Sequence, residues 1–158
     1  MKRRVVITGM GILAPESLGI DAFWEKITKG PNTADKITYF DVSDFSTKFA
    51  CELKVYNPED HFSKKDLRRK DKFVQYALVA AREAYKSAEL DKVTTPKERI
   101  GVYIGSGIGG IQTFEENVVA WHKEGPRRIS PFLIPMFIIN LVSGEVSIEF
   151  GFKGPNIS

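Results

Sequence analysis

The chain has 158 residues, of which 42% are hydrophobic and 27% charged, and its formal net charge is +3. These values are ordinary for a globular protein with one sizeable core, and the charge is too small to indicate nucleic-acid binding. The single cysteine, Cys51, excludes an internal disulfide framework and fits a reducing compartment. The basic start lacks the apolar run of a secretory signal, and the apolar stretch 132–142 is too short to span a bilayer. We therefore expect a cytoplasmic protein that contacts no membrane.

The N-terminal third predicts two strands and a helix. Val5–Thr8 is rich in β-branched residues and leads into a glycine turn, which predicts a buried strand. Asp21 is a suitable N-cap for a helix over residues 22–29, which a Gly-Pro pair ends. The looser alternation of residues 49–53 predicts an edge strand.

The longest predicted helix begins at Ser63 or Asp66 and runs to about Leu90. Its apolar positions recur at intervals of three and four residues and are mostly small. This spacing predicts a narrow face packed closely on something flat, such as a sheet: Phe73, Tyr76, Ala77, Ala80, Ala81 and Ala84.

The second half of the chain alternates strands with helices. A buried strand is predicted over 99–104, a helix over 111–122 and a largely apolar helix over 133–150. Strands that are near-continuous apolar runs between helices indicate an α/β protein with buried sheets. The last residues, 151–158, resemble a turn and the start of a core strand that would be left unpaired, so we expect an incomplete unit.

Two glycine-rich segments match the dinucleotide-binding fingerprint, namely Gly105–Gly110 and its variant ending in alanine, Gly9–Ala14. No helix follows the turn at Gly9–Ala14 directly, because Pro15 and Gly19 intervene. No strand ending in an acidic residue follows Gly105–Gly110 at the required distance. We therefore expect these glycines to permit tight turns and close strand–helix packing, and we expect no cofactor and no metal.

Several stretches, taken together and in this order, resemble the β-ketoacyl-acyl carrier protein synthases, and most of all the type II elongation member of that family. The resemblance implies a thiolase-like α/β fold of two similar halves in αβαβα layers. Residues 1–158 would form the N-terminal half and end just before the nucleophile turn. The stretches are VVITGMG (5–11), Phe23-Trp24, TKFA (47–50), RRKDKFVQY (68–76), RIGVYIGSGIGGIQTFEE (99–116), GPRRISPF (125–132) and GFKGPNIS (151–158).

The resemblance also implies the chemistry of a condensing acyltransferase of fatty-acid elongation, which joins acyl and malonyl thioesters by decarboxylation. In that family a cysteine at a helix N-terminus is the nucleophile, and histidines and a lysine from the second half complete the site. No catalytic residue is expected in this chain, which we predict to be inactive by itself. Cys51, His61 and His122 lie outside the family's catalytic motifs and are expected to be ordinary structural or surface residues.

A cluster of basic residues around position 68 is the strongest partner signal. Such a patch attracts small acidic proteins, and the resemblance implies that acyl carrier protein docks there. The residues implied for docking are Lys65, Arg68, Arg69, Arg127 and Arg128.

The resemblance assigns three apolar residues to the acyl pocket. In the family, the position of Ile108 is that of a gate residue facing the growing acyl chain. A branched side chain there would decide which chain lengths fit, since each buried methylene is worth about 0.8 kcal/mol. Leu133 and Ile134 would line the pocket of the neighbouring subunit, which implies a homodimer. Ordinary core packing is the alternative for all three residues.

Two rival functions remain open from the sequence. One is a dinucleotide-dependent oxidoreductase, which rests on the two glycine segments. The other is a non-catalytic module, either a truncated synthase that only docks carrier protein or a relative of the polyketide chain-length factors.

Overall fold

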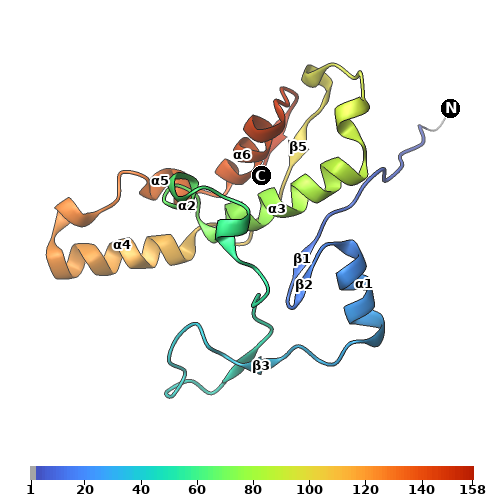
Figure 1. Cartoon of the computed structure of the whole chain (residues 1–158). Coiled ribbons are helices and arrows are strands. Elements are labelled where there is room, and N and C mark those ends of the chain that lie inside the picture. Colours follow the sequence, from blue (N-terminus) through green and yellow to red (C-terminus); the bar gives the residue numbers. More distant parts are fainter. Residues whose placement is uncertain (1–2) are drawn as a thin grey trace.

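Two helices packed side by side form the centre of the structure, a computed structural model that describes residues 3–158 (Figure 1). They are α3 (Lys72–Ser87) and α6 (Asn140–Phe150). Val74 and Leu78 of α3 are at most 1% exposed. The i, i+4 spacing of such residues places them on one face, which explains why the two helices bury their apolar sides against each other. Further core members are Phe62, Val79, Val102, Val142 and Val146.

The long helix predicted from position 63 to 90 is wrong in its continuity. The structure has a short helix, α2 (Lys64–Leu67), and then α3, with a break between them. Asp71 causes the break, because its backbone is extended (φ −63°, ψ 160°) and its side chain accepts a hydrogen bond from the Phe73 N–H. An aspartate in this conformation starts a helix and cannot continue one. A 3-10 turn, η2 (Leu90–Lys92), follows α3.

The small face of α3 packs against an extended segment and not against a sheet. A Cβ on Gly11 would lie 2.0 Å from the Ala80 carbonyl oxygen, and one on Gly9 would lie 2.5 Å from that of Ala84. The close packing is therefore confirmed, although its partner was wrongly predicted. Val5–Thr8 is also no strand, and Val5 is 94% exposed. No strand within residues 3–158 pairs with this segment, so its apolar side chains stay in solvent.

A hairpin and a helix follow the N-terminal segment. The strands β1 (Leu13–Ala14) and β2 (Ser17–Leu18) pair antiparallel and lead into α1 (Ile20–Lys29). The helix is confirmed, but Gly19 (φ 92°) precedes it, so the predicted N-cap Asp21 lies within its first turn. Glu83 of α3 accepts hydrogen bonds from the N–H groups of Ile12 and Ile20, both at 2.8 Å, and so anchors this unit.

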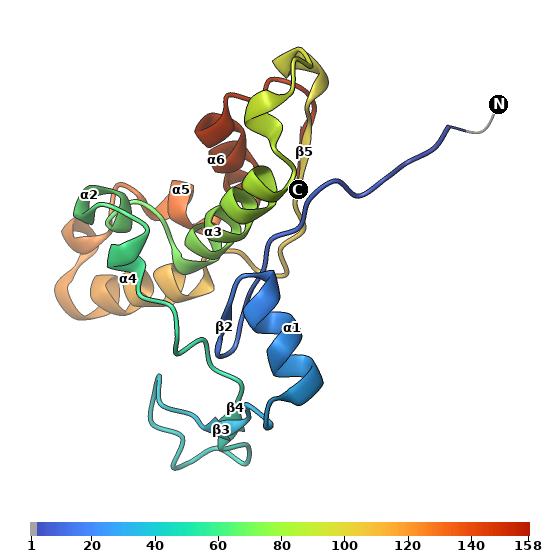
Figure 2. The ribbon, with the colours of Figure 1, turned by 45° about the vertical axis from the view of Figure 1, so that its right-hand side comes forward.

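Residues 31–57 extend away from the central helices in both views (Figures 1 and 2). The segment contains the antiparallel pair β3 (Asp35–Lys36) and β4 (Phe49–Ala50), so the predicted edge strand exists for its first two residues. Buried Glu52 holds the segment together, because it accepts hydrogen bonds from the N–H groups of Thr38 and Tyr39 and from the Thr38 hydroxyl. A 3-10 turn, η1 (Pro58–Asp60), leads back to the core.

The C-terminal strand does have a partner. β6 (Asn156–Ile157) pairs in parallel with β5 (Val102–Tyr103), which follows a 3-10 turn, η3 (Lys97–Arg99). The expectation that the chain's last strand lacks a partner is therefore wrong for the edge of β6 that pairs with β5. Asn156 fastens the pair to α6, since its side-chain amide donates to the Ser143 carbonyl oxygen at 2.8 Å.

The predicted helix over 133–150 is also divided. After α4 (Ile111–Glu124) and the 3-10 turn η4 (Pro126–Arg128), the chain forms α5 (Leu133–Phe137) and then α6. Ile138 is extended (ψ 137°), and the Phe137 carbonyl oxygen accepts from the Gly110 N–H at 3.0 Å. Because this carbonyl oxygen accepts a hydrogen bond from the glycine loop before α4, it does not accept the N–H that a continuous helix would direct at it.

Helices and strands alternate as an α/β chain requires, but every strand has two residues and each sheet has two strands. The predicted buried sheets are therefore not formed within residues 3–158. The solvent-accessible surface is 11609 Å². A compact monomer of this mass exposes about 8,000 Å². Large faces of the molecule are thus exposed to solvent. Among residues 3–158, none of the helices combines the length and the apolar composition of a membrane span.

Candidate functional site

The helix α2 presents a group of cations to solvent. Ser63 caps it, since its hydroxyl oxygen accepts from the Asp66 N–H at 3.2 Å. The hydrogen bond from the Ser63 hydroxyl lowers the pKa of the Asp66 carboxyl, and the nearby lysines lower it further. Asp66 is therefore ionised at neutral pH and offsets one of the positive charges. Four cations stay exposed around it, namely Lys64, Lys65, Arg68 and Arg69.

The basic residues of these segments differ in whether each one already forms a salt bridge within the chain. Lys70 pairs with Glu145 of α6, and Arg128 pairs with Glu124 of α4. Among the residues implied for docking, Lys65, Arg68 and Arg127 are exposed and have neither a salt-bridge partner nor a cation–π contact within residues 3–158. The neighbouring Lys64 is exposed and without a salt bridge in the same range. These side chains are the ones most available to an acidic partner.

One contact brings the two basic segments together. The Arg69 guanidinium lies over the Phe132 ring, 4.8 Å from its centroid, which is a cation–π geometry. Phe132 follows η4, which carries Arg127 and Arg128, so the α2 cluster and the η4 cluster border one surface. Both views show α2 beside α5 (Figures 1 and 2). The resemblance already grouped the two segments in one docking surface, but no local pattern in the sequence predicts the contact between Arg69 and Phe132.

The predicted pocket residues lie on two neighbouring segments. Ile108 is 63% exposed in the loop between β5 and α4. The ring of Phe114 in α4 stacks on that of Phe137 in α5 with centroids 5.0 Å apart, so this loop lies close to α5. On α5, Leu133 is half-buried and Ile134 is 60% exposed. The three side chains are thus accessible, and their assignment to an acyl pocket stays a prediction.

No constellation for covalent catalysis is present in the described residues. Cys51 is exposed and has no hydrogen bond to a basic side chain in the structure. The His61 ring stacks on Tyr56 with centroids 5.6 Å apart, and His122 is exposed in the last turn of α4. Between residues 3 and 158 there is also no group of three His, Cys, Asp or Glu side chains placed to bind a metal ion.

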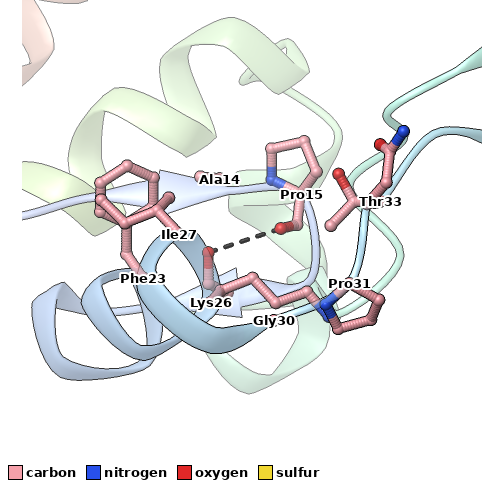
Figure 3. Close-up of a pocket in the computed structure, with 10 residues that line it drawn as sticks. Ala14, Pro15, Phe23, Lys26, Ile27, Gly30, Pro31 and Thr33 are labelled. Atoms are coloured by element: carbon pink, nitrogen blue, oxygen red, sulfur yellow. Dashed lines mark hydrogen bonds between the residues drawn. The ribbon is translucent and has the colours of Figure 1, made fainter.

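The hollow beside the N-terminal hairpin has a volume of about 360 Å³ (Figure 3). It lies between β1, α1 and the turn at Gly30 and Pro31, and its one charged side chain, Lys26, pairs with Glu16. None of the residues predicted for docking or for the acyl pocket lines it. Its walls offer no set of convergent polar groups that would identify a ligand.

Glycines in both motifs serve packing. Gly9 and Gly11 lie against the backbone of α3, and a Cβ on Gly110 would lie 2.0 Å from a backbone carbonyl oxygen of α5. Gly105 and Gly107 meet no such neighbour. The covered backbone at Gly9, Gly11 and Gly110 favours the close-packing interpretation over dinucleotide binding.

Sequence comparison places nearly the whole chain in one group. The family model described as "Beta-ketoacyl synthase, N-terminal domain" matches residues 2–158. The chain is 53% identical over 154 residues to 3-oxoacyl-[acyl-carrier-protein] synthase 2 of Staphylococcus aureus (strain COL), covering 98% of this chain and 37% of that protein. It is 45% identical over 157 residues to the protein of the same name from Coxiella burnetii, covering 99% and 38%. The chain thus spans less than two fifths of the length of these relatives.

Solved structures give the same fold. A type II polyketide ketosynthase, in complex with its acyl carrier protein and bound to a hexaketide, superposes with a TM-score of 0.77 at 25% identity, covering 96% of this chain and 40% of that one. A β-ketoacyl synthase from Burkholderia phymatum superposes with a TM-score of 0.78 at 21% identity, covering 99% of this chain and 38% of that one. The α/β fold expected from the sequence is thereby confirmed.

Proposed function

The chain belongs to the β-ketoacyl synthase family, and on that premise we propose that it forms the N-terminal part of a 3-oxoacyl-acyl carrier protein synthase of fatty-acid elongation. The observation that carries the proposal is the 53% identity to the staphylococcal synthase, which extends over 98% of the chain. A segment this similar throughout its length keeps the fold of its relative. The structure adds an open basic surface of the kind that suits an acidic carrier protein.

The reaction we propose for the whole protein has two stages. A cysteine thiolate attacks the acyl thioester carbonyl, and the carrier-protein thiol leaves with a proton. The malonyl thioester then loses CO2, and the resulting carbanion attacks the enzyme-bound acyl group. The carbon–carbon bond forms as the cysteine thiolate is expelled, and the product is a 3-oxoacyl thioester on carrier protein.

The part that we assign to residues 3–158 is recognition. We propose that Lys65, Arg68 and Arg127 contact acyl carrier protein directly. The resemblance to the family implies docking at these residues, and they are exposed and free of salt bridges and cation–π contacts within the described residues. Opposite charges steer such an encounter and fix its orientation. Arg128 is partly neutralised by Glu124 and contributes less.

The apolar side chains next to this surface fit the pocket role. Ile108 and Ile134 are more than half exposed, so both can contact an acyl chain or a second subunit. We propose that Ile108 gates the acyl pocket. Leu133 and Ile134 would reach the pocket of a partner subunit in a cytoplasmic homodimer.

The test of the proposed reaction uses the full-length protein. Incubation with an acyl-acyl carrier protein and malonyl-acyl carrier protein should release CO2 and form a 3-oxoacyl product, measured by mass spectrometry. Release of CO2 without carbon–carbon bond formation would contradict the proposal. The absence of both would also contradict it.

The 158-residue chain by itself is proposed to be inactive. With radiolabelled acyl-carrier protein we expect no covalent adduct, because exposed Cys51 has no base beside it. A stable acyl adduct on Cys51 that is lost in Cys51→Ser would overturn this proposal.

A further inference from the structure

A ring of contacts braces the two basic segments against each other. It begins at Arg69, whose guanidinium lies over the Phe132 ring. The Phe132 N–H donates to the Ser130 hydroxyl oxygen at 3.1 Å. The Ser130 N–H in turn donates to Oδ1 of Asn117 at 2.7 Å. Asn117 belongs to α4, so the loop after η4 is attached to that helix through one side chain.

The ring closes through the interior of the molecule. Nδ2 of Asn117 donates to the Thr113 carbonyl oxygen at 2.8 Å, and the Thr113 hydroxyl donates to Oδ2 of Asp71. The other oxygen of Asp71 accepts from the Phe73 N–H in the first turn of α3, and Asp71 lies two residues after Arg69. Six side chains thus join the segment after α2, the start of α3, helix α4 and the η4 loop: Arg69, Phe132, Ser130, Asn117, Thr113 and Asp71.

The inner part of this ring is shielded from water. Thr113 is 7% exposed and Asp71 is 8% exposed, whereas Asn117 is half-buried. A hydrogen bond to a buried carboxylate is stronger than a neutral one at the surface, and leaving a buried group without a partner is costly. The α4 end of the ring is therefore rigid. The η4 end rests on the two hydrogen bonds of Asn117 and on the Arg69–Phe132 contact.

We propose that Asn117 is a positioning residue for carrier-protein docking, and that Arg69 belongs to the same brace and is not a direct contact. The brace fixes Arg127 at a set distance from Lys65 and Arg68, so that all three meet one acidic partner. This inference rests on the proposed function, because it concerns the same docking surface. It adds a residue, Asn117, that carries no charge and touches no substrate.

The decisive experiment measures two substrates with the full-length Asn117→Ala variant. With acyl-acyl carrier protein we expect KM to rise about tenfold, which corresponds to about 1.4 kcal/mol, while kcat changes little. With an acyl-N-acetylcysteamine thioester, which lacks the carrier protein, KM and kcat should both stay as in the unsubstituted protein. Gln112→Ala is the matched control, because Gln112 lies on the same helix and bonds only to exposed Glu116. An equal loss with both substrates, or no change with either, would overturn the proposal.

A second measurement does not depend on turnover. Amide hydrogen exchange at Ser130 and Phe132 should become faster in Asn117→Ala, while protection within α3 stays unchanged. Asn117→Asp keeps the acceptor for the Ser130 N–H and should restore much of the protection. Unchanged exchange at Ser130 in Asn117→Ala would refute the brace, even if the protein proves to have no synthase activity. If the unsubstituted protein is inactive while exchange at Ser130 is faster in Asn117→Ala than in the unsubstituted protein, the proposed function is refuted and the brace stands.

Discussion

The cations of residues 64–70 and of η4 differ in whether each side chain forms a salt bridge with an acidic residue of the chain. Lys70 is largely covered in its pair with Glu145, whereas Arg68 is exposed and has no salt bridge in the described part of the chain. The sequence shows these residues as one cluster of like charge. Burial and pairing decide which of them can serve a partner, and neither is visible in the sequence.

Charge reversal at Arg68 should therefore weaken docking. We expect Arg68→Glu to raise the Kd for acyl carrier protein about tenfold at low salt, because it replaces an attraction by a repulsion. The effect should shrink as ionic strength rises. Titration calorimetry at two salt concentrations measures it. Lys92→Glu is the control, since Lys92 lies beyond the opposite end of α3 and is exposed. An equal loss in both variants would contradict a localised surface.

Glu52 makes the outlying segment sensitive to acid. The backbone hydrogen bond from Thr38 lowers the pKa of the Glu52 carboxyl below 4.5, with help from the Thr38 hydroxyl. The stability that this carboxylate adds is therefore present above about pH 4.5 and is lost as the pH falls through its folded value. We expect the amide signals of Thr38 and Tyr39 to shift together in an NMR titration below pH 4.5. Glu52→Gln should abolish that shared transition, and its persistence would contradict the assignment.

At the scale of elements, sequence patterns placed most helices but not their breaks. The helix over Ile111–Glu124 agrees closely with its prediction, because a glycine-rich loop precedes it and Gly-Pro follows. The breaks at Asp71 and Ile138 were not predicted. The break at Asp71 is local, since this residue caps α3 through the Phe73 N–H. The break at Ile138 accompanies a contact with a distant segment, because the Gly110 N–H donates to the Phe137 carbonyl oxygen.

The contact between α3 and the N-terminal segment depends on glycine. A Cβ at position 11 would lie 2.0 Å from the Ala80 carbonyl oxygen, so Gly11→Ala should lower the free energy of unfolding by about 1–3 kcal/mol. Gly144→Ala is the contrasting variant, because the added Cβ would have no atom within 4 Å apart from the chain neighbours and the backbone of its own helix. In helix α6 it should raise the free energy of unfolding by about 0.5–1 kcal/mol. Urea unfolding measures both. Equal effects of the two substitutions would contradict the packing described.

At the scale of the whole molecule, the exposed surface is the dominant fact. The accessible area of 11609 Å² exceeds the area of about 8,000 Å² for a compact chain of this mass. Several large apolar side chains contribute to it, including Ile7, Tyr103 and Ile148, each more than three quarters exposed. Apolar surface on this scale is normally covered by another part of a protein or by a second subunit.

The 158-residue chain expressed alone should therefore bind apolar dyes. We expect a several-fold rise in the fluorescence of 1-anilinonaphthalene-8-sulfonate, and self-association that grows with concentration. Full-length protein should show no such rise in fluorescence and no association beyond the proposed homodimer. Light scattering and dye titration measure the two properties. A dye-silent monomer would contradict the open faces described above.

The sequence by itself determined the family, the alternating α/β elements and the presence of a basic surface, because these depend on residue order and local pattern. Only the tertiary structure decided which cations are free, where α5 and α6 separate, and that Gly9, Gly11 and Gly110 pack against backbone. Each of these depends on contacts between segments far apart in the chain. Asn117 is the clearest case, since a neutral residue on a helix acquires its role only when the Ser130 N–H folds against it.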